Sequence, residues 1–253
     1  MTARAQSEAP PDGWEFLARF LYRDAADAFR ADRAMDPRLR DLGLAASLLN
    51  EPPVTSGKIN QAESLLRGLI AQGPADSTTL YARYLLARVL HQHRSAPIEE
   101  VEVAYRAVIA SSPASPVAQV AASHLALLLF YQRTDLPVDA RLREAQALEP
   151  VAAARALPEV ACGYYRDLAN AAMFYGVLNP EVLHWLKQAQ AVGSGDEITQ
   201  TTLTLQVAET ARALGQRDTA LAYYRRYLAT AVPTDQRYHT VEVRMRELEE
   251  SAR

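Results

Sequence analysis

Histidines and carboxylates are the first side chains to consider for chemistry. His91 and His93 form an H-x-H pair, but on a helix residues two apart point about 200° from each other and cannot share a metal ion. Glu99, Glu100 and Glu102 fall in the first turns of an expected helix, where carboxylates favour the positive end of the helix dipole. We therefore predict no metal site, no cofactor and no catalytic residue, and we expect that the chain is not an enzyme.

Three other features have structural explanations. The Gly193-Ser-Gly195 turn follows a helix rather than a strand, so it does not match a phosphate-binding loop. Cys162 is the only cysteine, which excludes an intrachain disulfide and predicts a small buried side chain. The Tyr-Tyr-Arg-Arg-Tyr run at 223–227 surrounds a helix axis, which places Tyr224 and Tyr227 in the core. With a net charge of −3, we expect no nucleic-acid partner.

The elements that carry these residues are expected to be helices. The chain has 253 residues, among them 46 Ala and 32 Leu, which are strong helix formers. No segment of useful length alternates with period two, and no segment has the length and apolar character of a membrane span. Predicted helices cover 13–34, 38–50, 57–73, 77–92, 97–111, 116–133, 138–149, 158–177, 180–192, 196–214, 217–231 and 235–251.

A repeat follows from the breaks after every second helix. They fall at Pro37, Pro74, Pro113, Pro150, Gly193 and Pro233, with spacings of 37, 39, 37, 43 and 40 residues. A large apolar residue lies eight residues before each of the first five breaks and nine before the last: Phe29, Leu66, Tyr105, Leu142, Trp185 and Tyr224. Further upstream, four units have Ala or Val and a fifth has Ala one place earlier, whereas the remaining unit has Glu181. A small residue lets two helices approach closely, and the large residue fills the space toward the next pair.

These residues resemble the tetratricopeptide repeat family over roughly residues 20–235. The clearest unit spans 201–233, and a second spans 80–113; their motif residues are Val207, Ala208, Ala211, Gly215, Ala220, Tyr224 and Pro233, and Leu86, Ala87, Leu90, Tyr105 and Pro113. The resemblance implies an all-α, right-handed α-solenoid of about six antiparallel helix pairs. The mean period is nearer 39 than 34 residues, so HEAT-like repeats are the alternative fold.

The expected domain organisation has two parts. We predict a disordered N-terminal segment at 1–12 and a single solenoid domain at 13–253, of which 233–253 forms a capping helix. The stripe Tyr238, Val241, Met245 and Leu248 gives that helix one apolar face. Ala3-Arg4-Ala5 has the form of a signal cleavage site, so localisation stays open between cytoplasmic and exported or periplasmic, with a signal peptide removed upstream of residue 6.

The family resemblance implies a non-catalytic scaffold or adaptor that binds a protein or peptide on its concave face. In such stacks the first helix of each pair lines that face, and aromatic and arginine side chains suit peptide capture. The predicted peptide-binding set is Tyr81, Tyr84, Arg88, His91, His124, Arg166, Asn170, Phe174, Leu205, Glu209 and Arg212. The alternatives are a helical enzyme with its active site in the groove and a self-assembling structural module that forms homo-oligomers.

Overall fold

The computed structural model describes residues 12–232 and 234–250, and in this part of the chain all regular structure is α-helical. The predicted break at Pro233 and the predicted disorder at 1–11 lie outside the described residues, whereas Asp12 caps the first helix. The chain divides into two compact units, Met1–Ser111 and Ser112–Arg253. A single domain over 13–253 stays a prediction.

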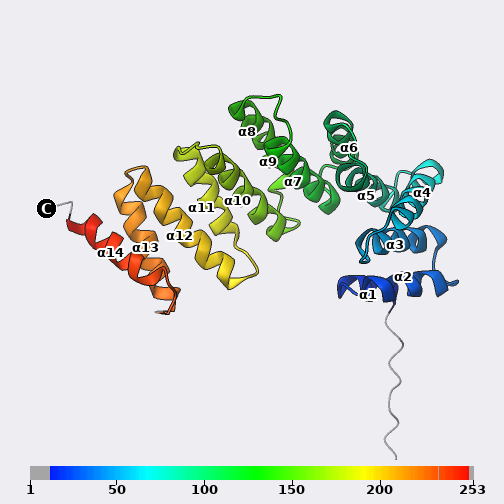
Figure 1. Cartoon of the computed structure of the whole chain (residues 1–253), viewed down its shortest axis with the longest axis horizontal. Helices are drawn as coiled ribbons and strands as arrows, with labels where there is room; N and C mark the ends of the chain where they lie inside the picture. Colours follow the sequence, from blue (N-terminus) through cyan, green and yellow to red (C-terminus); the bar gives the residue numbers. More distant parts are fainter. Residues whose placement is uncertain (1–11, 233, 251–253) are drawn as a thin grey trace, which may run out of the picture. The chain divides into compact units, whose positions relative to one another are not determined.

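The first unit is built from three helical hairpins whose consecutive helices pack on one another (Figure 1). Its core gathers Ala25, Phe29, Leu48, Leu66 and Val89. The helices of this unit are α1 (Gly13–Ala18), α2 (Tyr22–Ala31), α3 (Pro37–Asn50), α4 (Ser56–Gln72), α5 (Ser77–His93) and α6 (Ile98–Ser111).

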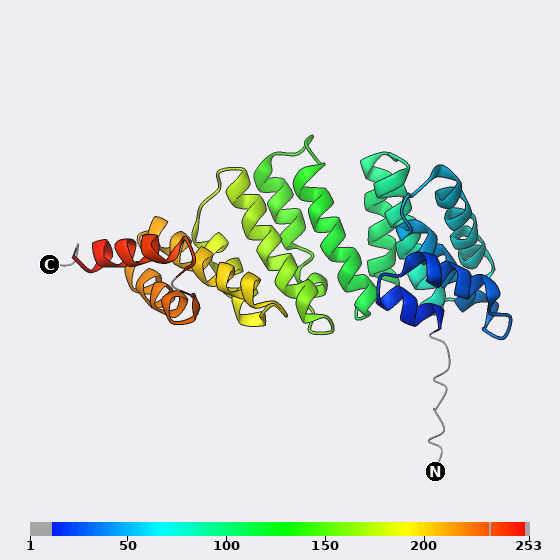
Figure 2. The same ribbon diagram turned by 60° about the horizontal axis from the view of Figure 1, so that its bottom comes forward.

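The second unit contains three more hairpins, a short additional helix and a final helix that packs on α13 (Figure 2). Its helices are α7 (Pro116–Tyr131), α8 (Val138–Gln146), α9 (Glu149–Ala152), α10 (Pro158–Phe174), α11 (Pro180–Val192), α12 (Glu197–Ala213), α13 (Arg217–Thr230) and α14 (Tyr238–Glu250). In the described residues, no helix combines the length and the apolar character needed to cross a bilayer.

Burial confirms the repeat that the sequence predicts. The large residue of each unit is at most 8% exposed in all six units: Phe29, Leu66, Tyr105, Leu142, Trp185 and Tyr224. Cys162 is 2% exposed and Tyr227 is fully buried, as predicted. The side chains of Asp36, Ser115 and Asn179 accept bonds from the first turns of α3, α7 and α11, each just before a proline that begins the helix.

The predicted continuous helix at 13–34 is wrong, because the backbone turns at Phe20. Phe20 has a φ of 60°, and its N–H and that of Leu21 donate to carbonyls in the last turn of α1. These bonds form a Schellman motif, which normally places glycine in the left-handed position. Gly176 and Gly215 occupy that position after α10 and α12, with φ values of 76° and 70°. The break at Phe20 therefore makes α1 and α2 the first hairpin.

The predicted helix at 138–149 is also wrong at its end. Helix α8 stops at Gln146, and the short helix α9 follows within residues 147–157, the inserted segment. The buried Gln119 of α7 holds this segment. Its amide nitrogen lies 2.6 Å from the carbonyl of Ala154 and 2.9 Å from that of Leu157, and its amide oxygen accepts the Leu157 N–H at 3.0 Å. A buried amide with both ends bonded fixes the segment against α7.

Candidate functional site

Three aromatic rings gather where α7 and α10 end, and we name this cluster the aromatic patch: Tyr131, Phe174 and Tyr175. The ring of Phe174 lies 6.2 Å from that of Tyr131 and 5.0 Å from that of Tyr175. Phe174 is 73% exposed and Tyr131 is 44% exposed. Large apolar side chains that gather on a surface mark interaction sites more often than isolated ones do.

A buried arginine supports the aromatic patch from α8. The Arg141 guanidinium lies 4.5 Å from the centre of the Tyr175 ring and donates to the carbonyl of Phe130 at 2.9 Å. It also donates to the Tyr175 hydroxyl at 3.1 Å, and that hydroxyl donates to the same carbonyl at 3.0 Å. These bonds connect the end of α7 to the residue after α10 and therefore hold the backbone that carries the exposed rings.

Polar residues continue this surface along α10. Arg166, Asn170 and Phe174 follow each other at four-residue spacing and share one face of the helix. The Arg166 guanidinium lies 3.4 Å from the carboxylate of Asp167, a long ion pair that leaves 40% of the arginine side chain exposed. The Asn170 amide oxygen accepts from Gln206 of α12 at 3.5 Å. Three of the predicted binding residues thus share one face of α10, and Phe174 at its end belongs to the aromatic patch.

Burial of the Asp167 carboxyl raises its pKa, although the neighbouring Arg166 acts in the opposite direction. Burial also raises the pKa of the Tyr131 hydroxyl, with further contributions from Asp167 and Tyr175. Asp167 of α10 therefore lies close enough to Tyr131 of α7 to raise the pKa of its hydroxyl. In the described residues, no group of three or more His, Cys, Asp or Glu side chains is placed to hold a metal ion.

The predicted binding residues of α5 belong to the first unit and differ in exposure. Tyr81 is 45% exposed, whereas Tyr84 and Arg88 are half-buried. The His91 Nδ1 lies 3.2 Å from the hydroxyl of the buried Tyr105, so this ring contacts α6. Burial lowers the pKa of His91 and raises that of Tyr84.

The predicted residues of α12 take part in contacts between helices. Leu205 is half-buried. The Glu209 carboxylate accepts bonds from Tyr224 of α13, from Arg244 of α14 and from Arg212. Burial raises the pKa of Glu209, but these three donors outweigh it and the net pKa is lowered. Glu209 therefore attaches the capping helix through Arg244, and Arg212 pairs with Glu209 within α12, contacts that the spacing on α12 does not show.

Sequence reasoning missed three residues of this surface. Tyr131 follows the predicted and half-buried His124 by seven residues, so both lie on one stripe of α7, and that period was the available signal. Tyr175 lies just beyond the end of α10, outside any helical period. Arg141 sits on a second helix, and no spacing in the sequence connects it to the ring that it supports.

No protein-family model matches the chain, and no curated protein matches it in sequence. Among solved structures, it is similar to PilW, described as a widely conserved type IV pilus biogenesis factor. Identity to PilW is 19%, the match covers 90% of this chain and 94% of PilW, and the TM-score is 0.53.

Two further solved structures match with lower TM-scores. One is TTC0263, a thermophilic TPR protein of Thermus thermophilus, at 20% identity over 84% of this chain and 99% of that chain, with a TM-score of 0.46. The other is the TPR domain of P58(IPK), at 19% identity over 94% of this chain and 62% of that chain, with a TM-score of 0.35.

The likeness to PilW, together with the buried repeat residues, shows an all-α fold built from successive helical hairpins. At this identity the likeness establishes the fold alone.

Proposed function

We propose that the chain is a non-catalytic scaffold that binds a protein or peptide partner through the aromatic patch and the adjoining face of α10. The observation that carries this proposal is the exposure of Phe174 and Tyr131 as one cluster across two helices, supported from below by Arg141. Aromatic and arginine side chains dominate binding energy at interfaces, because they offer a large contact area at low entropic cost. Arg166 adds a half-exposed guanidinium on the face of α10 that leads to the patch.

The titratable groups with shifted pKa values support a structural rather than a catalytic role. The Asp76 carboxylate accepts a bidentate pair from Arg38, and this hydrogen bonding lowers its pKa strongly. Burial raises the pKa of Glu63, but ion pairs with Arg67 and Arg94 outweigh it and lower the net value. The pairs with Arg38 and Arg94 join different helices and the pair with Arg67 lies within α4, and structural ion pairs of this kind are a common reason for a perturbed pKa.

A comparison of two exposed side chains tests the proposal. Phe174→Ala removes the most exposed ring of the aromatic patch, and Ile198→Ala removes a side chain that is 77% exposed on α12. The measurement is affinity capture from the source organism, quantified by mass spectrometry, with wild type and both variants. We expect at least one partner that wild type and Ile198→Ala retain and that Phe174→Ala loses at an unchanged melting temperature.

Two outcomes contradict the proposal. A partner that all three proteins retain equally moves the contact away from the aromatic patch. Capture of the chain itself, together with a dimer mass in light scattering that Phe174→Ala abolishes, makes the chain a self-assembling module instead.

A further inference from the structure

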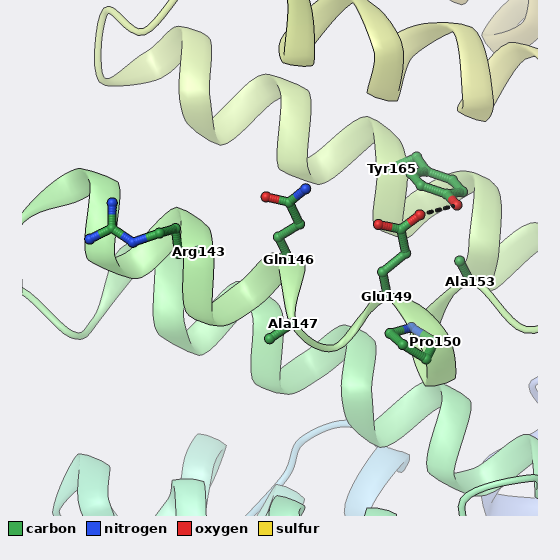
Figure 3. Close-up of a pocket in the computed structure, with 7 residues that line it drawn as sticks. All are labelled: Arg143, Gln146, Ala147, Glu149, Pro150, Ala153 and Tyr165. Atoms are coloured by element: carbon green, nitrogen blue, oxygen red, sulfur yellow. Dashed lines mark hydrogen bonds between the residues drawn. The ribbon is translucent and has the colours of Figure 1, made fainter.

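A pocket of about 720 Å³ lies between α8, the inserted segment and α10 (Figure 3). Its apolar lining is made of small residues, Ala147, Pro150 and Ala153, and it opens widely to solvent. Its polar lining comes from Arg143 and Gln146 of α8, Glu149 of α9 and Tyr165 of α10. None of these residues belongs to the predicted binding set or to the aromatic patch.

The two ends of this pocket carry opposite charge. Figure 3 shows Arg143 at one end and Glu149 at the other, with Gln146 between them. The Tyr165 hydroxyl donates to one oxygen of the Glu149 carboxylate at 2.8 Å, which orients that group. Burial and this hydrogen bond raise the pKa of Tyr165 to about 12, so the phenol keeps its proton. A carboxylate held by one bond retains further lone pairs for a cation.

The neighbouring groups are held in position as well. The Gln146 amide nitrogen donates to the Glu181 carboxylate of α11 at 3.1 Å, which orients the amide. The pocket wall that carries Glu149 is the inserted segment, which Gln119 fixes from beneath through the carbonyls of Ala154 and Leu157. A site whose groups are ordered before binding loses less entropy when a ligand arrives.

We propose that this pocket binds a segment of a partner protein that carries a basic side chain and an acidic side chain on either side of small apolar residues. The basic group pairs with Glu149, the acidic group pairs with Arg143, and the small residues lie over Ala147, Pro150 and Ala153. A protein segment fits better than a free metabolite, because sites for small molecules enclose most of the ligand and this pocket is open.

The pocket is separate from the proposed contact at the aromatic patch. Tyr165 and Phe174 lie nine residues apart on α10, which corresponds to about 13 Å along the helix axis. Loss of binding at one site is therefore measured independently of the other, because Phe174→Ala leaves every pocket residue in place.

Nuclear magnetic resonance of the full ¹⁵N-labelled chain tests this proposal. The probes are the blocked tetrapeptides acetyl-Glu-Ala-Ala-Arg-amide and acetyl-Arg-Ala-Ala-Glu-amide, the neutral acetyl-Gln-Ala-Ala-Gln-amide, and free arginine. We expect saturable shifts at the amides of Ala147, Ala153 and Tyr165 with one of the two charged peptides, at millimolar affinity or better. Glu149→Gln, which keeps an oxygen for Tyr165, and Arg143→Ala are each expected to weaken binding at least tenfold.

Matched variants show that charge in the pocket is responsible. Glu159→Gln and Arg155→Ala change exposed charges of the same unit that do not line this pocket, and they are expected to bind as wild type does. Arg143 is exposed, so Arg143→Ala decides the result even if Glu149→Gln lowers the melting temperature. The proposal is overturned if no charged peptide saturates, if the neutral peptide or free arginine binds equally well, or if Arg143→Ala binds as wild type.

Discussion

At the residue scale, a few carboxylates connect helices that are distant in the sequence. Glu209 is the clearest case, since it receives donors from α12, α13 and α14 at once. Its partner Arg244 lies 35 residues further along the chain. Hydrogen bonds to charged groups contribute more than neutral ones, and removing one partner leaves the others without compensation. We therefore expect acidic pH and single substitutions to lower the free energy of unfolding most at such residues.

Glu209→Gln should destabilise the chain by about 1–3 kcal/mol at pH 7, because the neutral amide no longer compensates Arg212 and Arg244. The pKa of Glu209 is lowered in the folded state, so the unfolded chain binds more protons in acid. The stabilisation that the Glu209 charge provides is fully present above the pKa of an unfolded glutamate, about 4.3. It is lost as the pH falls through the pKa of Glu209 in the folded chain. The difference from wild type should therefore shrink below about pH 4.

Denaturant unfolding at pH 7, 5, 4 and 3 measures that difference. Glu247→Gln is the control, because Glu247 is an exposed carboxylate on α14. A difference between wild type and Glu209→Gln that stays constant down to pH 3 would contradict the role assigned to the charge.

Phe20→Gly should be more stable than Phe20→Ala by at least about 0.5 kcal/mol. Phe20 has a left-handed backbone, which costs an L-residue about 1–2 kcal/mol relative to glycine. The ring is 76% exposed, so both variants lose little burial. Thermal and denaturant unfolding of the two variants measures the difference. Equal stability would mean that the turn after α1 relaxes to a different conformation.

At the element scale, the capping helix α14 is held by one buried apolar contact and several arginine bonds. Val241 is 1% exposed, the Arg217 guanidinium donates to the carbonyl of Leu248 at 2.7 Å, and Arg225 pairs with Glu249 at 2.7 Å. The apolar stripe that the sequence shows is thus only partly buried. Terminal helices of a repeat protein protect the last core from solvent.

Deletion of residues 235–253 should cost about 2–4 kcal/mol and promote association, because it uncovers apolar side chains of α13. Val241→Ala should give a smaller loss of about 1 kcal/mol with no association. Melting temperature and light scattering measure both effects. A truncated chain that melts like wild type and stays monomeric would show that α14 is an appendage.

Periodicity predicted most of the elements, but it missed the break at Phe20 and placed the end of the helix at 138–149 too late. The positions before each break predicted the buried residues in every unit, from Phe29 to Tyr224. The turn at Phe20 was missed because a helix break in the left-handed conformation is normally signalled by glycine, and here a phenylalanine adopts it. The support of the aromatic patch by Arg141 was missed because the contact joins two helices whose relative placement the sequence does not contain.

At the scale of the whole molecule, the two compact units each have a buried core. Leu66 in the first unit and Leu168 in the second are both fully buried. In helical repeat proteins, stability is approximately a sum of local terms, since each repeat contacts only its neighbours. A defect in one core should therefore be felt first within its own unit.

Leu66→Ala and Leu168→Ala should each cost about 2–5 kcal/mol. Hydrogen exchange followed by mass spectrometry measures where protection is lost. We expect Leu66→Ala to accelerate exchange mainly before residue 112 and Leu168→Ala mainly after it, with Leu39→Ala, an exposed site, changing neither. Equal loss in both units after either substitution would show that the chain unfolds as one cooperative block.

The inserted segment lengthens one repeat in the sequence, but the hairpin that follows it packs as the other hairpins do. The unit from Pro150 to Gly193 is the longest, at 43 residues, yet Leu142 before it and Trp185 within it are both buried. Because Gln119 ties the extra residues back onto α7, they are absorbed locally and the following hairpin keeps its register. The extra residues at this connection therefore lengthen the repeat without removing the large residue of the next hairpin from the core.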